Sequence, residues 1–283
     1  MGRTFTSLTD GGSFFEGPRW RDGRWWVSDF YRHTVYAIAP GGDTEAVLTV
    51  DAQPSGLGWL PDGSLLVVSM RDRRVLRREP GGKVTVHADF AEHCGGHAND
   101  MVVDARGHAY VGNFGFDLTG REEPRPAALV HIAPDGTVAV AADDLAFPNG
   151  AVITPDGTTL VVGETMGGRY TAFTIGDDGS LGDRRVWATV AAAPDGCALD
   201  AEGRIWAADA AGNRVVRVAE GEGIVDEIAA PDGLGVYACM LGGDDNRTLL
   251  VCGAPDYFEP NRRSAREAVL LTTAVDVPHA GLP

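Results

Sequence analysis

The sequence predicts an all-β protein, a six-bladed β-propeller in which four-stranded antiparallel blades surround a central channel. Three observations support this fold. Apolar runs of strand length alternate with short turns, no long amphipathic helical pattern occurs, and one module of apolar runs and turns recurs along the chain. Repeats of about 40–50 residues that contain several short strands are typical of propeller blades. Six repeats use nearly the whole length, so residues 1–283 are expected to form a single domain.

The repeats are best seen in the turn between the first two strands of each module. These turns lie at Asp22-Gly23, Asp62-Gly63, Arg106-Gly107, Asp156-Gly157, Glu202-Gly203 and, less clearly, Asp245-Asn246. Asp-Gly between two apolar runs is a strong signal for a β-hairpin. A β-sandwich or barrel with evenly spaced hairpins is the alternative, but sandwich hairpins rarely repeat one turn in register. The repeat therefore favours the propeller.

Closure of the ring and packing between blades also have sequence signals. A propeller commonly closes when one terminus completes the blade begun by the other, and residues 5–8 could add a strand beside residues 268–272. The six tryptophans are expected to pack between blades, because large aromatic side chains fill the wedge-shaped space between sheets. The four cysteines form neither a C-x-x-C pair nor a zinc-finger spacing, so they are expected to be buried and reduced.

Composition and missing motifs narrow the function. Lys and Arg number 24 against 40 Asp and Glu, a formal net charge of −16, which argues against nucleic acid and against an anionic membrane surface as partners. The chain begins without the apolar run of a signal peptide and contains no apolar stretch long enough to span a bilayer, so a cytoplasmic location is expected. The G-x-S-x-G, H-E-x-x-H, G-K-[ST] and G-x-G-x-x-G motifs are all absent. These absences argue against serine hydrolases, zincins, P-loop proteins and Rossmann dehydrogenases.

One register position carries candidate ligands. The residue before each first apolar run is, around the ring, Glu16, Ser55, Asn99, Asn149, Asp195 and, by a weaker alignment, Ala238. First strands line the channel of a propeller, so these residues should converge, and converging carboxylates need a cation. A set made only of oxygen ligands favours Ca²⁺, although Mg²⁺, Mn²⁺ and Zn²⁺ remain possible. The alternative is that Asn and Asp before Gly simply form turns. Four oxygen-bearing residues in one register favour a metal site.

The motifs Glu16-Gly17-Pro18, Asn99-Asp100, Pro148-Asn149-Gly150 and Pro194-Asp195-Gly196 together resemble those of the SMP-30/gluconolactonase family. This resemblance implies a six-bladed propeller with one divalent metal ion at the top of its channel and lactonase activity. It further implies that Glu16, Asn149 and Asp195 are the metal ligands, and that Asn99 lies beside the metal and touches substrate.

The chain departs from the sugar-lactonase pattern at two positions. His97 stands where those relatives have a substrate-binding Arg, and Phe116 stands roughly where they have a Glu. The expected substrate is therefore a lactone or ester less polar than a sugar lactone, bound by His97, Asn99, Asn113, Phe114 and Phe116. Residues 113–128 form a long connection without a counterpart in the other repeats and are a candidate lid.

The mechanism that the resemblance implies is metal-assisted hydrolysis of a small molecule. Asp195 would act as ligand and general base, Asp100 is a second candidate base, and His97 would donate to the oxyanion or relay a proton. Two alternatives stay open at this point. The propeller could bind a small molecule without catalysis, or use the metal as a Lewis acid in another reaction on a biosynthetic intermediate. A monomer or a small homo-oligomer is expected.

Overall fold

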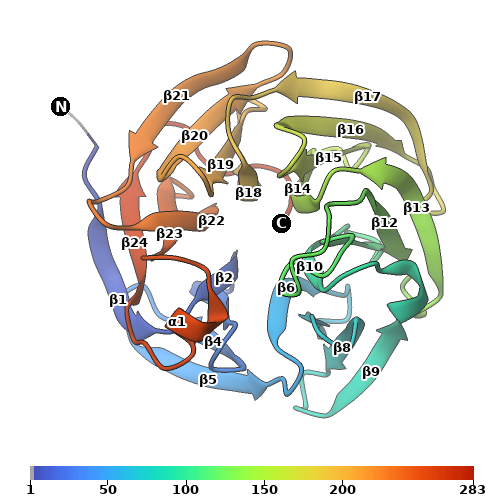
Figure 1. Cartoon of the computed structure of the whole chain (residues 1–283), viewed down its shortest axis with the longest axis horizontal. Helices are drawn as coiled ribbons and strands as arrows, with labels where there is room; N and C mark the ends of the chain where they lie inside the picture. Colours follow the sequence, from blue (N-terminus) through green and yellow to red (C-terminus); the bar gives the residue numbers. More distant parts are fainter. Residues whose placement is uncertain (1–2) are drawn as a thin grey trace.

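The computed structural model describes residues 3–283 and forms six four-stranded antiparallel sheets arranged radially around a central channel (Figure 1). The predicted six-bladed β-propeller is therefore confirmed. In blades 1 to 5 the strands follow one another outward from the channel. Between residues 3 and 283 no helix is long and apolar enough to cross a membrane.

The first three blades follow one another in chain order. Blade 1 contains β2 (Phe15–Arg21), β3 (Arg24–Asp29), β4 (Thr34–Ile38) and β5 (Thr44–Thr49). Blade 2 contains β6 (Pro54–Trp59), β7 (Leu65–Ser69), β8 (Arg74–Arg78) and β9 (Val84–Asp89). After a 3-10 turn, η1 (Ala91–His93), blade 3 contains β10 (Ala98–Val103), β11 (Ala109–Asn113), β12 (Ala127–Ile132) and β13 (Val138–Leu145).

The last three blades complete the circle. Blade 4 contains β14 (Pro148–Ile153), β15 (Thr159–Glu164), β16 (Arg169–Ile175) and β17 (Leu181–Thr189). Blade 5 contains β18 (Pro194–Leu199), β19 (Ile205–Asp209), β20 (Arg214–Ala219) and β21 (Gly223–Ala229). Blade 6 contains β22 (Gly235–Gly242), β23 (Thr248–Ala254) and β24 (Ala268–Ala274), and the connection between β23 and β24 carries the short helix α1 (Glu259–Arg262).

The ring closes as the sequence predicts. Strand β1 (Thr6–Gly12) is the outermost strand of blade 6 and pairs antiparallel with β24, Thr6 opposite Thr272 and Ser7 opposite Leu271. Tryptophan packing between blades is also seen, since Trp26 of blade 1 and Trp59 of blade 2 meet edge to face with ring centroids 5.4 Å apart. All four cysteines are buried and free of disulfide bonds, as expected.

Glycines let the innermost strands of neighbouring blades approach each other closely. A Cβ atom on Gly56 would lie 2.3 Å from the backbone nitrogen of Met101, and one on Gly150 would lie 2.4 Å from the carbonyl oxygen of Asp195. These distances are far below van der Waals contact, so only glycine fits. In the four blades that have this glycine, the close approach brings the residue before it toward its neighbours around the channel.

The C-terminal segment crosses the opposite ends of the inner strands. Leu282 exchanges backbone hydrogen bonds with Ile153 at the end of β14, and the amide of Ala280 donates to the carbonyl of Leu199 at the end of β18. Figure 1 shows the C-terminus near the centre of the ring, behind the inner strands. The residues of the candidate site lie at the other ends of these strands.

Candidate metal centre and active site

The structure brings the predicted ring residues together. Asn99, Asn149 and Asp195 are each the second residue of an innermost strand, and their side chains form a hydrogen-bonded chain across three blades. The Nδ2 atom of Asn99 donates to Oδ1 of Asn149 at 2.8 Å, and Nδ2 of Asn149 donates to Oδ1 of Asp195 at 2.6 Å. Glu16 holds the same register position in β2, and Ser55 holds it in β6.

The sixth position of the ring is Tyr237, and the alignment that gave Ala238 was wrong by one residue. Val236 pairs with Gly253 as Pro194 pairs with Asp209, and a bulge follows each pair. Ala238 is thus the counterpart of Gly196, and a Cβ atom on Gly196 would lie 2.5 Å from that of Ala238. Blade 6 lacks the Asx-Gly pair that marks the register in blades 4 and 5, so nothing local fixed the alignment.

The two acidic residues of the ring repel each other in a dehydrated setting. Burial, followed by the charge of Asp195, raises the pKa of Glu16 well above its ordinary value, despite a hydrogen bond from the Gly17 amide. Burial and then the charge of Asp100 raise the pKa of Asp195 to about 8, although Asn149 donates to it. The positive charge near each carboxylate is therefore too small to offset its burial and the neighbouring negative charges.

The donor set fits a hard cation only if amide oxygens take part. Across residues 3–283 no three His, Cys, Asp or Glu side chains are grouped so as to hold a metal ion. Glu16 and Asp195 provide two carboxylates, and Oε2 of Glu16 accepts from the Gly17 amide while Oδ1 of Asp195 accepts from Asn149. Two carboxylates with a neighbouring carboxamide are oxygen donors of the kind that Ca²⁺ and Mg²⁺ prefer. The residues present fit a divalent cation.

Asp100 lies one residue beyond the ring and is paired with Arg19, a residue that the sequence analysis did not single out. The Nη2 atom of Arg19 lies 2.7 Å from Oδ1 of Asp100, and both side chains are buried. The same guanidinium also donates to the carbonyls of Pro18, Leu57 and Met101. Asp100 is thus held in an ion pair beneath the ring.

Phe114 and His97 border the site, whereas two other predicted substrate-binding residues are enclosed. Phe114 is half-buried, stacks on Phe147 with ring centroids 4.6 Å apart, and lies 6.0 Å from the His97 ring. Phe116 is only 2% exposed and packs against Phe147. Asn113 is fully buried; its side chain donates to the carbonyl of Ala128 and accepts from the Gly115 amide. Asn113 therefore holds the loop that presents Phe114.

The protonated form of His97 is disfavoured in this setting. Burial, and then the nearby positive charge of Arg71, lower its pKa. Its ring nitrogens make no hydrogen bond to any residue from 3 to 283. A neutral imidazole with free nitrogens can donate to one group and accept from another.

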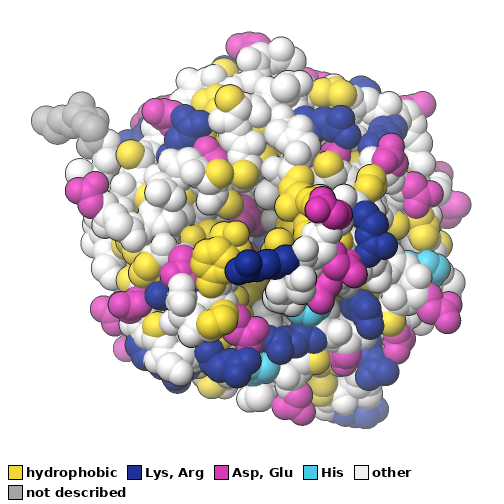
Figure 2. Space-filling view, viewed as in Figure 1, with side chains coloured by type: hydrophobic (Ala, Val, Ile, Leu, Met, Phe, Trp, Pro, Cys, Tyr) yellow, Lys and Arg dark blue, Asp and Glu magenta, His cyan; other side chains and the backbone are white. Residues whose placement is uncertain are grey.

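A second loop, which the sequence analysis did not identify, reaches over the same end of the channel. The connection between β23 and β24 is as long as that between β11 and β12, and its α1 segment pairs Glu259 with Arg71 of blade 2 at 2.7 Å. Tyr31 donates to the carbonyl of Tyr257, and Tyr257 stacks on Phe258. Figure 2 shows hydrophobic side chains on two sides of a central hollow.

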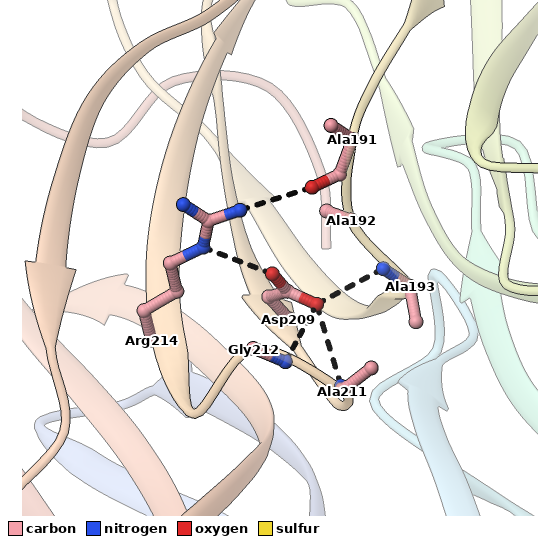
Figure 3. Close-up of a pocket in the computed structure, with 7 residues that line it drawn as sticks. All are labelled: Ala191, Ala192, Ala193, Asp209, Ala211, Gly212 and Arg214. Carbon is pink, nitrogen blue, oxygen red and sulfur yellow. Dashed lines mark hydrogen bonds and ion pairs between the residues drawn. The ribbon is translucent and has the colours of Figure 1, made fainter.

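A cavity lies at the loop that precedes Asp195. It has a volume of about 430 Å³ and is lined by Ala191, Ala192, Ala193, Asp209, Ala211, Gly212 and Arg214 (Figure 3). Arg214 is fully engaged, since it donates to Asp209, Glu227 and the carbonyl of Ala191. Asp209 in turn accepts amide hydrogens from Ala193, Ala211 and Gly212. These contacts fix the loop that precedes Asp195.

Comparison with known proteins identifies the family. The family described as SMP-30/gluconolactonase/LRE-like region matches residues 14–254. The chain belongs to this family. A 6-deoxy-6-sulfogluconolactonase of Pseudomonas putida is 26% identical over 283 aligned residues, which cover 95% of this chain and 93% of that protein.

Solved structures of similar proteins share the fold of this family member. A calcium-binding protein, regucalcin, of Agrobacterium tumefaciens has a TM-score of 0.81 and 21% identity, over 100% of this chain and 96% of that one. A luciferin-regenerating enzyme has a TM-score of 0.84 and 20% identity, over 99% and 98% of the two chains. Both are likenesses of fold.

Proposed function

We propose that this member of the SMP-30/gluconolactonase family is a lactone hydrolase that uses one divalent cation, Ca²⁺ being the ion that best suits its ligands. The observation that carries this proposal is the convergence of Glu16, Asn149 and Asp195 in one register of the propeller. The similarity to a 6-deoxy-6-sulfogluconolactonase supports the choice of lactones as the substrate class.

In this proposal Glu16, Asn149 and Asp195 hold the cation, which supplies a Lewis acid for the carbonyl and a lower pKa for water. Asp195 takes a proton from the attacking water through Oδ2. The water oxygen bonds to the carbonyl carbon, the bond from that carbon to the ring oxygen breaks, and the ring oxygen takes the proton from Asp195. The product is an open hydroxy acid. Asn99 orients the substrate through its side-chain amide.

The other residues have supporting roles in the proposal. His97, which is partly exposed and has a lowered pKa, donates a hydrogen bond to the substrate. Asp100, already bound to Arg19, is less suited than Asp195 to accept a proton. Asn113 and Phe116 position the loop, and Phe114 contacts the substrate.

We also propose that the substrate is less polar than a sugar lactone. Two groups of aromatic side chains flank the entrance. Phe114 and Phe147 stack on one side, and Tyr257 and Phe258 stack on the other, where Phe258 is 54% exposed. Aromatic faces favour an alkyl or aryl substituent on the lactone ring.

A panel of lactones tests the proposal, with metal content measured on the same samples. We expect the purified protein to contain about one divalent ion per chain, to lose lactonase activity on chelation, and to regain it with Ca²⁺. Glu16→Gln and Asp195→Asn should each lower kcat/KM by at least about a hundredfold. The surface variant Glu220→Gln is the matched control. Metal binding without hydrolysis of any lactone would contradict the hydrolase and favour a binding protein.

A further inference from the structure

The charge around the ring comes from more groups than the two ligand carboxylates. Asp100 follows Asn99 along β10 and forms a buried ion pair with Arg19 of β2, and the charges of both act on Glu16. Three carboxylates and one guanidinium leave two net negative charges when all four groups are ionised. A divalent cation balances that sum, whereas Glu16, Asp195 and Asp100 without Arg19 would leave three.

The side chain of Arg19 is buried and held by several hydrogen bonds. Its side chain is 3% exposed and that of Asp100 is 6% exposed, so the pair is shielded from water. The guanidinium donates to carbonyl oxygens in blades 1, 2 and 3, at Pro18, Leu57 and Met101. Planar guanidinium geometry suits several fixed acceptors at once, so Arg19 also locks the inner strands that carry Glu16 and Asn99.

We propose that Arg19 neutralises Asp100, so that the cation site keeps the two negative charges of Glu16 and Asp195 that a divalent ion balances. Arg19 is a positioning residue that compensates Asp100, and an Arg19 left without Asp100 would repel the cation. This inference rests on the proposed function, because it concerns the same cation site.

The pair can be dissected because Asn in place of Asp100 still accepts the hydrogen bond from Arg19. Asp100→Asn removes one negative charge and leaves Arg19 uncompensated. A unit charge within several ångströms of a divalent ion, at an effective dielectric constant of about 20, changes its affinity by roughly tenfold or more. The double variant Arg19→Met with Asp100→Asn removes both charges and returns the sum to its original value.

Calorimetric titration of the full-length protein with CaCl₂ tests the proposal. We expect Asp100→Asn to raise the Kd for Ca²⁺ at least about tenfold, and the double variant to return it to within about threefold of the unmodified protein. Asp104→Asn is the matched control, since Asp104 is also buried in blade 3 and paired with an arginine, Arg106, but lies at the other end of β10. This control should leave the Kd unchanged. Thermal unfolding of each apo-protein confirms that the variants are folded.

The outcomes separate this inference from the proposed function. If the unmodified protein binds Ca²⁺ and Asp100→Asn changes the Kd by less than about threefold, the charge-setting role is refuted while the metal site stands. A double variant that binds as weakly as Asp100→Asn, or more weakly, also refutes it and assigns the pair to strand packing alone. If the unmodified protein binds no divalent cation, both proposals fail.

Discussion

Substitution of Glu164 by Gln tests how much the buried contacts of this residue, next to the candidate site, stabilise the protein. Glu164 is the last residue of β15 and its side chain is completely buried. It receives two hydrogen bonds from Arg169, at 2.8 and 2.9 Å, and one each from Thr171 and the Ala146 amide. The contact with Ala146 fixes the turn that precedes Asn149, so the carboxylate supports the end of β14 that carries this ring residue.

The size of the effect follows from these contacts. Hydrogen bonds to a charged group are each worth about 1.5–3 kcal/mol, and a glutamine would place its own amide hydrogens against one of the present donors. Removing one partner of a fully buried ion pair costs about 3–5 kcal/mol, but the Arg169 side chain is 36% exposed and can regain water. We therefore expect Glu164→Gln to lower the free energy of unfolding by about 2 kcal/mol at pH 7.

The effect should depend on pH in one direction. Burial raises the pKa of Glu164, but the hydrogen bonds from Arg169, Ala146 and Thr171 outweigh it, and the net pKa is lowered. A lowered pKa in the folded state gives stability that is fully present above the unfolded value, about 4.3 for Glu, and is lost as pH falls through the folded value. The difference between Glu164→Gln and the unmodified protein should thus be constant from pH 6 to 8 and shrink below about pH 4.

Urea unfolding at several pH values measures this difference. Glu79→Gln is the control, because Glu79 forms an exposed pair with Lys83 at 3.7 Å, and it should change the free energy of unfolding by less than about 0.5 kcal/mol. A difference for Glu164→Gln that grows as the pH falls, or one no larger than that of the control, would refute the reasoning.

Three other predictions address the ring, the cation and the entrance. Gly196→Ala should destabilise the protein by more than about 2 kcal/mol and weaken Ca²⁺ binding, because the added Cβ would lie 2.5 Å from that of Ala238. Both effects are measured by calorimetry, and Gly41→Ala is the control, because Gly41 has open space around it. Ca²⁺ at about 100 times its Kd should stabilise the protein by about 2.7 kcal/mol in thermal unfolding, and chelation should abolish that gain. Phe114→Ala should raise KM several-fold for alkyl-substituted lactones and leave KM for polar ones unchanged, which steady-state kinetics can check.

The fold could be predicted because its signals are local. An Asp-Gly turn between two apolar runs specifies a hairpin through backbone conformation alone, and repetition of that hairpin specifies blades. Gly23, Gly63 and Gly157 all adopt positive φ angles, as such turns require. The closing strand was also predictable, since a ring of repeats leaves one terminus to complete the last blade.

The site was predictable only where a local motif marks the register. Asn149-Gly150 and Asp195-Gly196 share a pattern because glycine is needed where neighbouring inner strands touch, so the residue before it could be placed on the ring. Blade 6 reaches the same contact with Ala238, and the pattern disappears. The loop of residues 255–267 gave no signal either, because its contacts with Arg71 and Tyr31 join segments far apart in the sequence.

The charge of the centre is the part that local signals cannot supply. Arg19 lies in a strand between Pro18 and Trp20, where its sequence context is that of any strand residue, and its partner Asp100 comes from the third blade. A motif identifies which residues can bind a cation, but the number of charges around that cation is a sum over several blades. Two proteins with identical ligands can therefore differ in ion preference if they differ at a buried pair such as Arg19 and Asp100. Predicting the ion requires the packed ring, since only there does each charge have its neighbours.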